Sequence, residues 1–178
     1  MELDFLHALR DLLASPPLDA VMSGVTYLGS GGVIWLAVAV MLFVTKRDRR
    51  LAVLLVVSLV ATAVTGELII KNVVQRLRPF ITDPTIELII SAPSGYSFPS
   101  GHTASGFGCA TVICRECKER WPRVAAVALA ALIAFSRLYL NVHYPTDILG
   151  GIILGVCVGL LVTHIANKRF PVREERSS

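Results

Sequence analysis

The chain has 178 residues, a length typical of one domain, and 54% of its residues are hydrophobic while only 17% are charged. In soluble domains about a quarter of the residues are charged, so this composition indicates a membrane protein. The length predicts a single domain over 1–178. The net charge of +4 comes from basic residues that flank apolar segments, and no basic stripe interleaved with aromatic residues supports a nucleic-acid partner.

Residues 1–15 predict a short amphipathic helix at the membrane interface. Its apolar side chains share one helical face, whereas Asp4, Arg10 and Asp11 lie elsewhere, and the segment is too short to span a bilayer. A cleavable signal peptide is the alternative interpretation. The missing basic leading region and the acidic Glu2 and Asp4 argue against it.

Five uncharged apolar segments follow, at 20–45, 51–66, 103–114, 124–135 and 148–167. A membrane-spanning helix needs about 20 residues, so the second and fourth segments must run on through Ile70 and Asn141. The third is the shortest and must borrow neutral neighbours on both sides. We therefore predict an all-α integral-membrane bundle over 20–168, with about five transmembrane helices and six helices in all.

Basic residues set the expected orientation. They follow the first, third and fifth segments: Lys46, Arg47, Arg49 and Arg50; Arg115, Lys118, Arg120 and Arg123; Lys168, Arg169, Arg173 and Arg176. The positive-inside rule makes this side cytoplasmic, including the tail 169–178. The N-terminus and the connections after the second and fourth segments are then extracytoplasmic.

The first polar cluster runs from Lys71 to Pro79, after the second apolar segment. Lys71 and Arg78 are seven residues apart, so two turns of helix would place both cations on one face as an anion clamp, until Pro79 ends the helix. The alternative is a pair of cations that snorkel at a helix end. Glu67 precedes Lys71 by four residues and either pairs with it or is a boundary carboxylate without a role.

The second cluster is Pro99-Ser100-Gly101-His102, directly before the third apolar segment. Free backbone N–H groups at the start of that helix would face an anion, and Gly101 would let a ligand approach closely. His102 lies in the same turn. Taken alone, a histidine at a membrane boundary is more often structural than catalytic.

The third cluster contains Ser136, Arg137, His143 and Asp147, between the fourth and fifth segments. Pro145 suits the first turn of the fifth helix, which would place the Asp147 carboxylate within reach of the His143 imidazole. An aspartate that fixes one ring nitrogen as a donor leaves the other nitrogen free to act as a nucleophile.

Together the three clusters favour phosphoryl transfer. A phosphate ester and its transition state need several cations, which Lys71, Arg78 and Arg137 would supply, together with backbone N–H donors. The clusters hold too few carboxylates for a two-metal site, and the Cys114-x-x-Cys117 pair lacks a second ligand pair, so we predict no metal and no cofactor.

These motifs, Lys71-x6-Arg78-Pro79, Pro99-Ser100-Gly101-His102 and Ser136-Arg137-x5-His143-x3-Asp147, resemble those of the type 2 phosphatidic acid phosphatase (PAP2) superfamily in order and spacing. The resemblance implies that His143 attacks phosphorus and forms a phosphohistidine, and that Asp147 orients His143. It implies that His102 protonates the leaving oxygen and later activates water. Phosphate would be bound by Lys71, Arg78, Ser100, Gly101 and Arg137, with Ser136 as a supporting residue.

Larger membrane members of that family have six spans, whereas here the first is reduced to the helix before Ser15, which leaves the route of lipid access open. A small, outward-facing site favours undecaprenyl diphosphate as substrate, with phosphatidate, phosphatidylglycerophosphate or a lipid A phosphate as alternatives. The expected partners are the lipid substrate and membrane lipids, and the sequence indicates no protein partner. A phospholipid binder or transporter would need the cations but not both histidines and Asp147. The related vanadate-dependent haloperoxidases are largely soluble, unlike this apolar chain.

Overall fold

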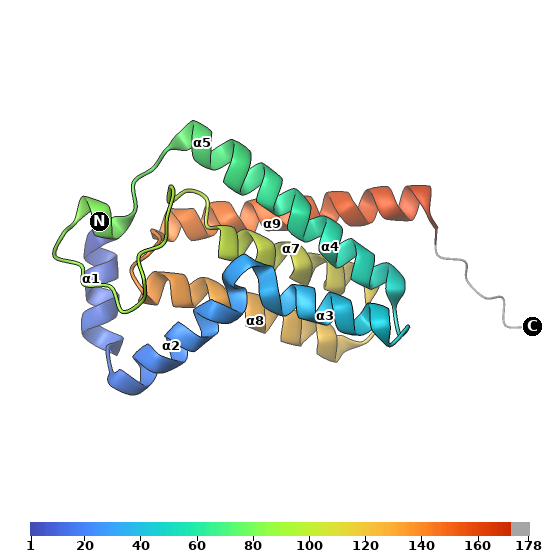
Figure 1. Cartoon of the computed structure of the whole chain (residues 1–178), viewed down its shortest axis with the longest axis horizontal. Coiled ribbons are helices and arrows are strands. Elements are labelled where there is room, and N and C mark those ends of the chain that lie inside the picture. Colours follow the sequence, from blue (N-terminus) through green and yellow to red (C-terminus); the bar gives the residue numbers. More distant parts are fainter. Residues whose placement is uncertain (172–178) are drawn as a thin grey trace, which may run out of the picture.

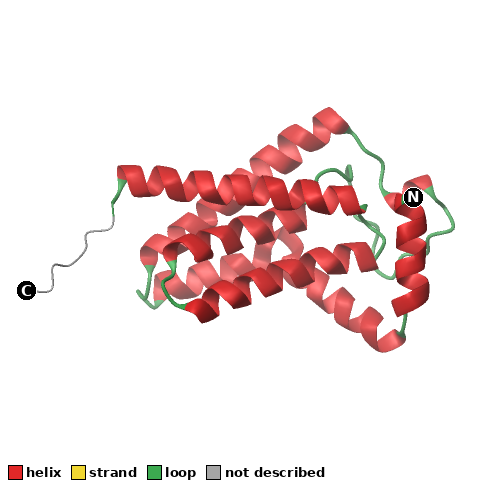
Figure 2. Ribbon diagram, turned by 180° about the vertical axis from the view of Figure 1, so that it is seen from behind, coloured by secondary structure: helices red, strands yellow, loops and turns green. Residues whose placement is uncertain are grey.

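The computed structural model describes residues 1–171, and every regular element in that range is helical. The elements are α1 (Glu2–Leu13), α2 (Pro16–Gly29), η1 (Ser30–Gly32), α3 (Val33–Val44), α4 (Arg49–Ala63), η2 (Val64–Ile70), α5 (Lys71–Val74), α6 (Pro79–Thr82), α7 (Gly101–Glu116), α8 (Arg120–Tyr139) and α9 (Pro145–Arg169). Figures 1 and 2 show them as an elongated bundle. The predicted all-α class is confirmed. Arg173 and Arg176 of the predicted tail lie outside the described residues.

Four helical stretches in the described part are long and apolar enough to cross a membrane: Pro16–Val44, Arg49–Thr82, Arg120–Tyr139 and Pro145–Arg169. The third predicted segment forms α7, which has only 16 residues. This helix lies at the centre of the bundle, against α4, α8 and α9. All five predicted apolar segments are helical. That α7 is the fifth membrane-spanning helix stays a prediction.

The first apolar segment is bent at a glycine-rich turn rather than being one continuous helix. Gly31 and Gly32 have φ of 59° and 70°, in the left-handed region that side chains with a Cβ disfavour. Helix α2 ends at Gly29 and α3 begins at Val33. The bend brings η1 against α7, the helix that carries His102.

The second apolar segment continues from α4 through the wide turns of η2 into α5 and stops at Val74. Gln75 then adopts a left-handed conformation with φ of 50°. Our prediction that two regular helical turns join Lys71 to Arg78 is therefore wrong, because the residues after Val74 leave the helix. The two cations reach the same region across a bend of the chain after α5 (Figure 1).

Close contact between α7 and α9 fixes the centre of the bundle. A Cβ at Gly151 would lie 2.8 Å from both the Ser100 carbonyl oxygen and the Thr103 Cβ, so the two backbones approach as closely as glycine allows. Below this contact, Trp35, Leu55, Cys109 and Val112 are almost fully buried. Many large apolar side chains on the outside of the helices are exposed, as a lipid-facing surface requires.

The two ends of the bundle differ in character. At one end α1 lies across the other helices (Figure 1), with Leu6 fully buried. At the other end Arg50 donates to Glu116 at 2.9 Å and to Asn167 at 2.6 Å. These contacts join the regions that follow the first, third and fifth apolar segments, as the predicted topology requires.

Candidate active site

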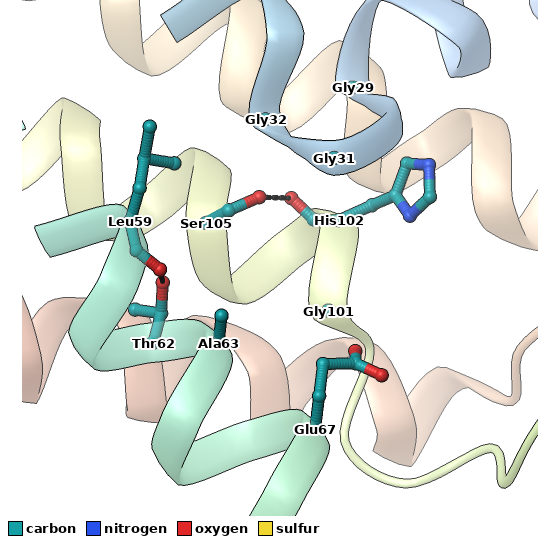
Figure 3. Close-up of a pocket in the computed structure, with 10 residues that line it drawn as sticks. All are labelled: Gly29, Gly31, Gly32, Leu59, Thr62, Ala63, Glu67, Gly101, His102 and Ser105. Atoms are coloured by element: carbon teal, nitrogen blue, oxygen red, sulfur yellow. Dashed lines mark hydrogen bonds between the residues drawn. The ribbon is translucent and has the colours of Figure 1, made fainter. Parts of the chain in front are cut away.

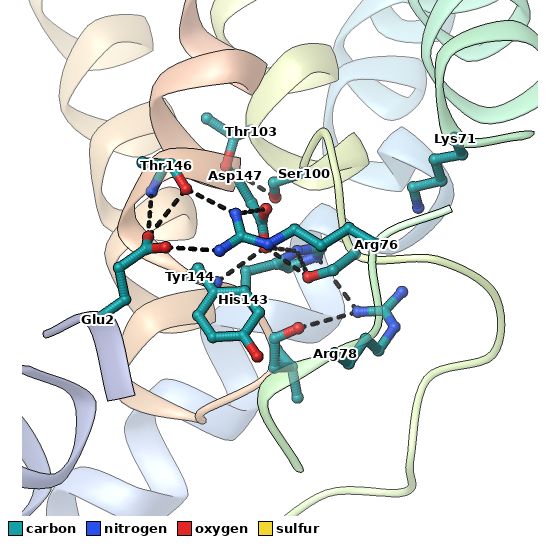
Figure 4. Close-up of polar contacts among 12 residues, drawn as sticks. Glu2, Lys71, Arg76, Arg78, Ser100, Thr103, His143, Tyr144, Thr146 and Asp147 are labelled. Carbon is teal, nitrogen blue, oxygen red and sulfur yellow. Dashed lines mark hydrogen bonds and ion pairs between the residues drawn. The ribbon is translucent and has the colours of Figure 1, made fainter. Parts of the chain in front are cut away.

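The three polar clusters meet at the end of the bundle that α1 covers. Figure 4 shows Lys71 and Arg78 from the segment after η2, Ser100 from the start of α7, and His143 and Asp147 from the turn into α9. The His102 imidazole lies near His143 and near Arg78, Arg137 and Lys71, whose positive charges act on it. The structure therefore brings both histidines and the three cations together.

His143 and Asp147 form the predicted pair at the start of α9. Pro145 occupies the first turn of α9, His143 immediately precedes that helix, and His143 Nδ1 lies 3.4 Å from Asp147 Oδ2. The same carboxylate oxygen accepts the Tyr144 backbone N–H at 2.8 Å. Both side chains are buried, with His143 1% and Asp147 0% exposed.

The surroundings of His143 keep its imidazole neutral. Burial lowers the pKa of His143 to about 3, against the opposing effect of the bond to Asp147, and the charges of Arg78 and Arg137 act in the same direction as burial. Arg78 Nη1 lies 3.4 Å from His143 Nε2. A guanidinium can only donate, so this contact assigns the lone pair to Nε2 and the proton to Nδ1, on the Asp147 side.

Arg78 is held by main-chain carbonyls from two segments. Its guanidinium donates to the oxygens of Ser94, Gly95 and Val142, each at 3.0 Å, and its side chain is buried. These neutral acceptors fix the direction of the guanidinium without neutralising its charge. The cation therefore remains available to an anion beside His143.

Arg137, in the last turn of α8, is also buried and cationic. Its Nη1 donates to the Thr26 hydroxyl of α2, while its Nε has no partner among the described residues. A buried guanidinium with an unused donor is suited to an anionic ligand. Ser136, by contrast, donates its hydroxyl to the Ile133 carbonyl at 2.7 Å, within its own helix.

Lys71 is buried and pairs with Glu67. The ammonium Nζ lies 2.9 Å from Glu67 Oε2, across one turn of the same helical segment, so pairing is the alternative that the structure supports. The side chain of Lys71 is 8% exposed and that of Glu67 45% exposed. An anion that binds Lys71 must compete with this carboxylate.

Helix α7 begins at the site with Ser100 as its N-cap residue. The Ser100 backbone N–H donates to the Asp147 carbonyl at 3.0 Å, and the Thr103 hydroxyl donates to Ser100 Oγ at 3.0 Å. These bonds tie the start of α7 to the start of α9. A Cβ at Gly101 would meet the Glu67 carboxylate, so the Glu67 side chain would have to move to admit any larger residue there.

A cavity of about 230 Å³ opens beside His102 (Figure 3). His102, Gly101 and Glu67 line it together with Gly29, Gly31, Gly32, Leu59, Thr62, Ala63 and Ser105. His102 Nε2 lies 3.3 Å from the Ser30 hydroxyl, and its ring packs so closely on Gly29 that a Cβ there would be 2.9 Å from His102 Cδ2. The bend between α2 and α3 thus forms the wall opposite α7.

Sequence reasoning missed Arg76 and Ser97. Arg76 Nη1 donates to Asp147 Oδ1 at 2.7 Å, and the Ser97 hydroxyl donates to Asp147 Oδ2. Arg76 is a third cation in the run from Lys71 to Arg78, which could have indicated it. Ser97 carries no comparable signal, because its role depends on a loop that returns to α9.

Groups of three or more His, Cys, Asp or Glu side chains placed to hold a metal ion do not occur among residues 1–171. The cysteines at the opposite end, Cys114 and Cys117, are free thiols. The predicted absence of a metal cofactor remains a prediction.

Comparison with known proteins connects the site to a family. The model of the PAP2 superfamily matches residues 51–171. An undecaprenyl-diphosphatase of Sulfolobus acidocaldarius is 35% identical over 134 residues, which are 74% of this chain and 63% of that protein. A decaprenylphosphoryl-5-phosphoribose phosphatase of Mycobacterium tuberculosis is 32% identical over 165 residues, 92% of this chain and 89% of that one.

A solved structure has the same fold. The transmembrane PAP2 type phosphatidylglycerolphosphate phosphatase from Bacillus subtilis superimposes with a TM-score of 0.79 and 25% identity, over 97% of this chain and 87% of its own.

Proposed function

The chain belongs to the PAP2 superfamily, and from this premise we propose that it removes the terminal phosphate of a membrane lipid through a phosphohistidine intermediate. That it is a phosphatase and a multi-pass membrane protein follows from the family and its relatives. The observation that supports the proposed mechanism is the contact of His143 Nδ1 with Asp147 and of His143 Nε2 with Arg78.

His143 is the proposed nucleophile. Its neutral imidazole carries a lone pair on Nε2, which attacks phosphorus, while Asp147 stabilises the positive charge that develops on the ring. The new P–N bond forms as the bond from phosphorus to the lipid oxygen breaks. Arg78, Arg137 and Lys71 stabilise the negative charge on the equatorial oxygens, together with the Ser100 hydroxyl and the Gly101 backbone N–H at the start of α7.

His102 is the proposed acid and base. It gives a proton to the leaving lipid oxygen, then takes one from the water that attacks the phosphohistidine and releases inorganic phosphate. The cavity beside His102 supports this assignment, because it gives the leaving group a place on the His102 side of the site. Ser30 orients the imidazole from the bend.

Undecaprenyl diphosphate is the proposed substrate. The support is the undecaprenyl-diphosphatase among the relatives, which matches this chain over 63% of its own length. Phosphatidylglycerophosphate is the main alternative, since a solved relative acts on that class. Phosphatidate and a lipid A phosphate are further alternatives, because the reacting centre contacts only the terminal phosphate.

We also propose that the site faces the extracytoplasmic side and the C-terminus the cytoplasm. The support is the gathering of basic segments at the opposite end of the bundle, where Arg50 contacts Glu116 and Asn167.

The deciding experiment measures phosphate release by purified protein in mixed micelles, from matched concentrations of the four lipid classes. We expect the highest kcat/KM with undecaprenyl diphosphate. His143→Asn should lower kcat at least about 1,000-fold with inorganic phosphate still binding as an inhibitor of residual turnover. The matched control is His164→Asn, the same change at an exposed position of α9. A folded wild-type protein that released phosphate from none of these lipids would end the proposal.

A further inference from the structure

The Arg76 side chain connects the N-terminal helix to the buried carboxylate of Asp147 (Figure 4). Its Nη1 lies 2.7 Å from Asp147 Oδ1, and its Nη2 lies 2.5 Å from Glu2 Oε2 of α1. The proposed phosphate chemistry uses neither Arg76 nor Glu2. Both are about one-third exposed or less, so the connection is partly shielded from solvent.

A count of donors to Asp147 shows what Arg76 adds. Oδ2 receives the Ser97 hydroxyl, the Tyr144 N–H and the His143 ring N–H. Oδ1 has Arg76 as its only partner among the described residues. Since Asp147 is fully buried, loss of Arg76 would leave one carboxylate oxygen unsatisfied and free to rotate toward other donors.

Arg76 is itself fixed in direction. Its guanidinium stacks 3.9 Å from the centre of the Tyr144 ring and donates to the Thr146 hydroxyl at 2.6 Å. Its backbone carbonyl accepts the Ser97 N–H at 2.8 Å. Arg76 therefore reaches Asp147 twice, directly and through Ser97, which donates to the other oxygen.

Glu2 completes the arrangement from α1. Its carboxylate accepts from Thr146, through the backbone at 3.1 Å and the hydroxyl at 2.8 Å, as well as from Arg76. Burial raises its pKa, but the bonds from Thr146 and Arg76 outweigh that effect and the pKa lies below its ordinary value. Glu2 therefore stays ionised and balances the Arg76 charge.

We infer that Arg76 is a positioning residue, which holds Asp147 so that Oδ2 faces His143, and that Glu2 makes α1 part of this arrangement. The inference rests on the proposed function, because Arg76 would affect catalysis only by orienting Asp147, which in turn orients the nucleophile His143. Arg76 does not touch phosphate in this role. Its loss should slow formation of the phosphohistidine without weakening phosphate binding.

Arg76→Gln tests the inference in the purified full-length protein. We expect kcat and the single-turnover rate of phosphoenzyme formation to fall about 10- to 100-fold, by analogy with the loss of a hydrogen-bond partner behind a metal-bound histidine. KM and the inhibition constant of inorganic phosphate should change less than about threefold. Arg76→Lys keeps one charged donor and should recover part of the lost rate.

Two further variants separate positioning from a general effect on α1. His7→Gln removes another contact of α1, the 2.8 Å pair of His7 with Asp83, and should leave kcat unchanged. Glu2→Gln should lower kcat about threefold in the wild-type background and have no further effect in Arg76→Gln, because the two residues act in series.

The inference is overturned if Arg76→Gln keeps kcat within about twofold of wild type. It is also overturned if kcat and phosphate affinity fall together, which would make Arg76 a phosphate ligand, or if His7→Gln lowers kcat as much as Arg76→Gln. A wild-type protein without phosphatase activity would instead refute the proposed function, so the two failures are distinguishable.

Discussion

At the scale of single residues, the buried imidazole of His143 links function to stability. In the unfolded chain a histidine titrates near pH 6.5, whereas in the folded protein burial lowers the pKa of His143 to about 3. Between these values the unfolded state binds a proton that the folded state does not. The free energy of unfolding therefore falls as the pH falls below about 6.5.

This gives a prediction for thermal unfolding of the detergent-solubilised protein. Lowering the pH from 7 to 5 should reduce the Tm of wild type, with His143 contributing up to about 1.4 kcal/mol for each pH unit below 6.5. In His143→Asn the fall in Tm over the same range should be smaller, because asparagine does not titrate. Equal slopes for the two proteins would show that His143 has the same pKa in the folded protein as in the unfolded chain.

A second prediction concerns Glu67, whose carboxylate neutralises the Lys71 ammonium at 2.9 Å. Glu67→Gln leaves Lys71 without this competitor, so inorganic phosphate should bind more tightly, with its inhibition constant falling at least about threefold. The measurement is inhibition of lipid hydrolysis by phosphate. Glu87→Gln removes the same charge at an exposed position of the loop and should leave that constant unchanged. A weaker inhibition in Glu67→Gln would show that Glu67 mainly orients Lys71.

At the scale of elements, the glycines of α9 set the distance between the helices that carry His102 and Asp147. A Cβ at Gly155 would meet the backbone of α7 at the Ala104 oxygen and, at 2.8 Å, the Gly108 nitrogen. Backbone atoms cannot turn aside as a side chain can. An alanine there forces α7 and α9 apart.

Gly155→Ala should therefore destabilise the protein by about 1–3 kcal/mol, the usual cost of overpacking. It should also lower kcat at least about tenfold, because a shift of about 1 Å between reacting groups is costly. Tm and phosphate release measure both effects. Gly24→Ala is the control, since a Cβ at Gly24 has no atom within 4 Å and should change neither quantity. A Gly155→Ala protein with wild-type kcat would mean that the α7–α9 spacing does not determine the site.

The same scale shows which elements the sequence could predict. Uncharged runs located every long helix, and the Pro145 and Ser100 signals located the starts of α9 and α7, because both depend on local chemistry. The wide turns of η2 and the end of the helix at Gln75 were not predictable from apolar runs. The bend at Gly31 was overlooked, although two adjacent glycines within an apolar segment are a signal for it.

At the scale of the whole molecule, the order of apolar segments and polar motifs along the chain is enough to predict that the chemistry lies on one side. Topology alone brings the three motifs to one end, because they lie in the two connections, after the second and after the fourth apolar segment, that the alternating direction of the helices places on the same side. The contact of Asp147 with Ser97 could not be foreseen, since it depends on how the loop before α7 returns to the start of α9. Arg76 could have been noticed as a third cation beside Lys71 and Arg78, but its contact with Asp147 also depends on packing. Long-range contacts of this kind are set by packing rather than by local sequence.

The proposed orientation can be tested in intact cells. Glu87 lies exposed in the loop at the site end, and Lys118 lies exposed between α7 and α8 at the other end. In a variant without Cys109, Cys114, Cys117 and Cys157 that retains phosphatase activity, a single cysteine is introduced at either position. A membrane-impermeant maleimide should label Glu87→Cys in intact cells and Lys118→Cys only after permeabilisation. The reverse pattern would place the site in the cytoplasm and exclude action on lipids of the outer leaflet, because a charged phosphate head group does not cross the hydrocarbon core unaided.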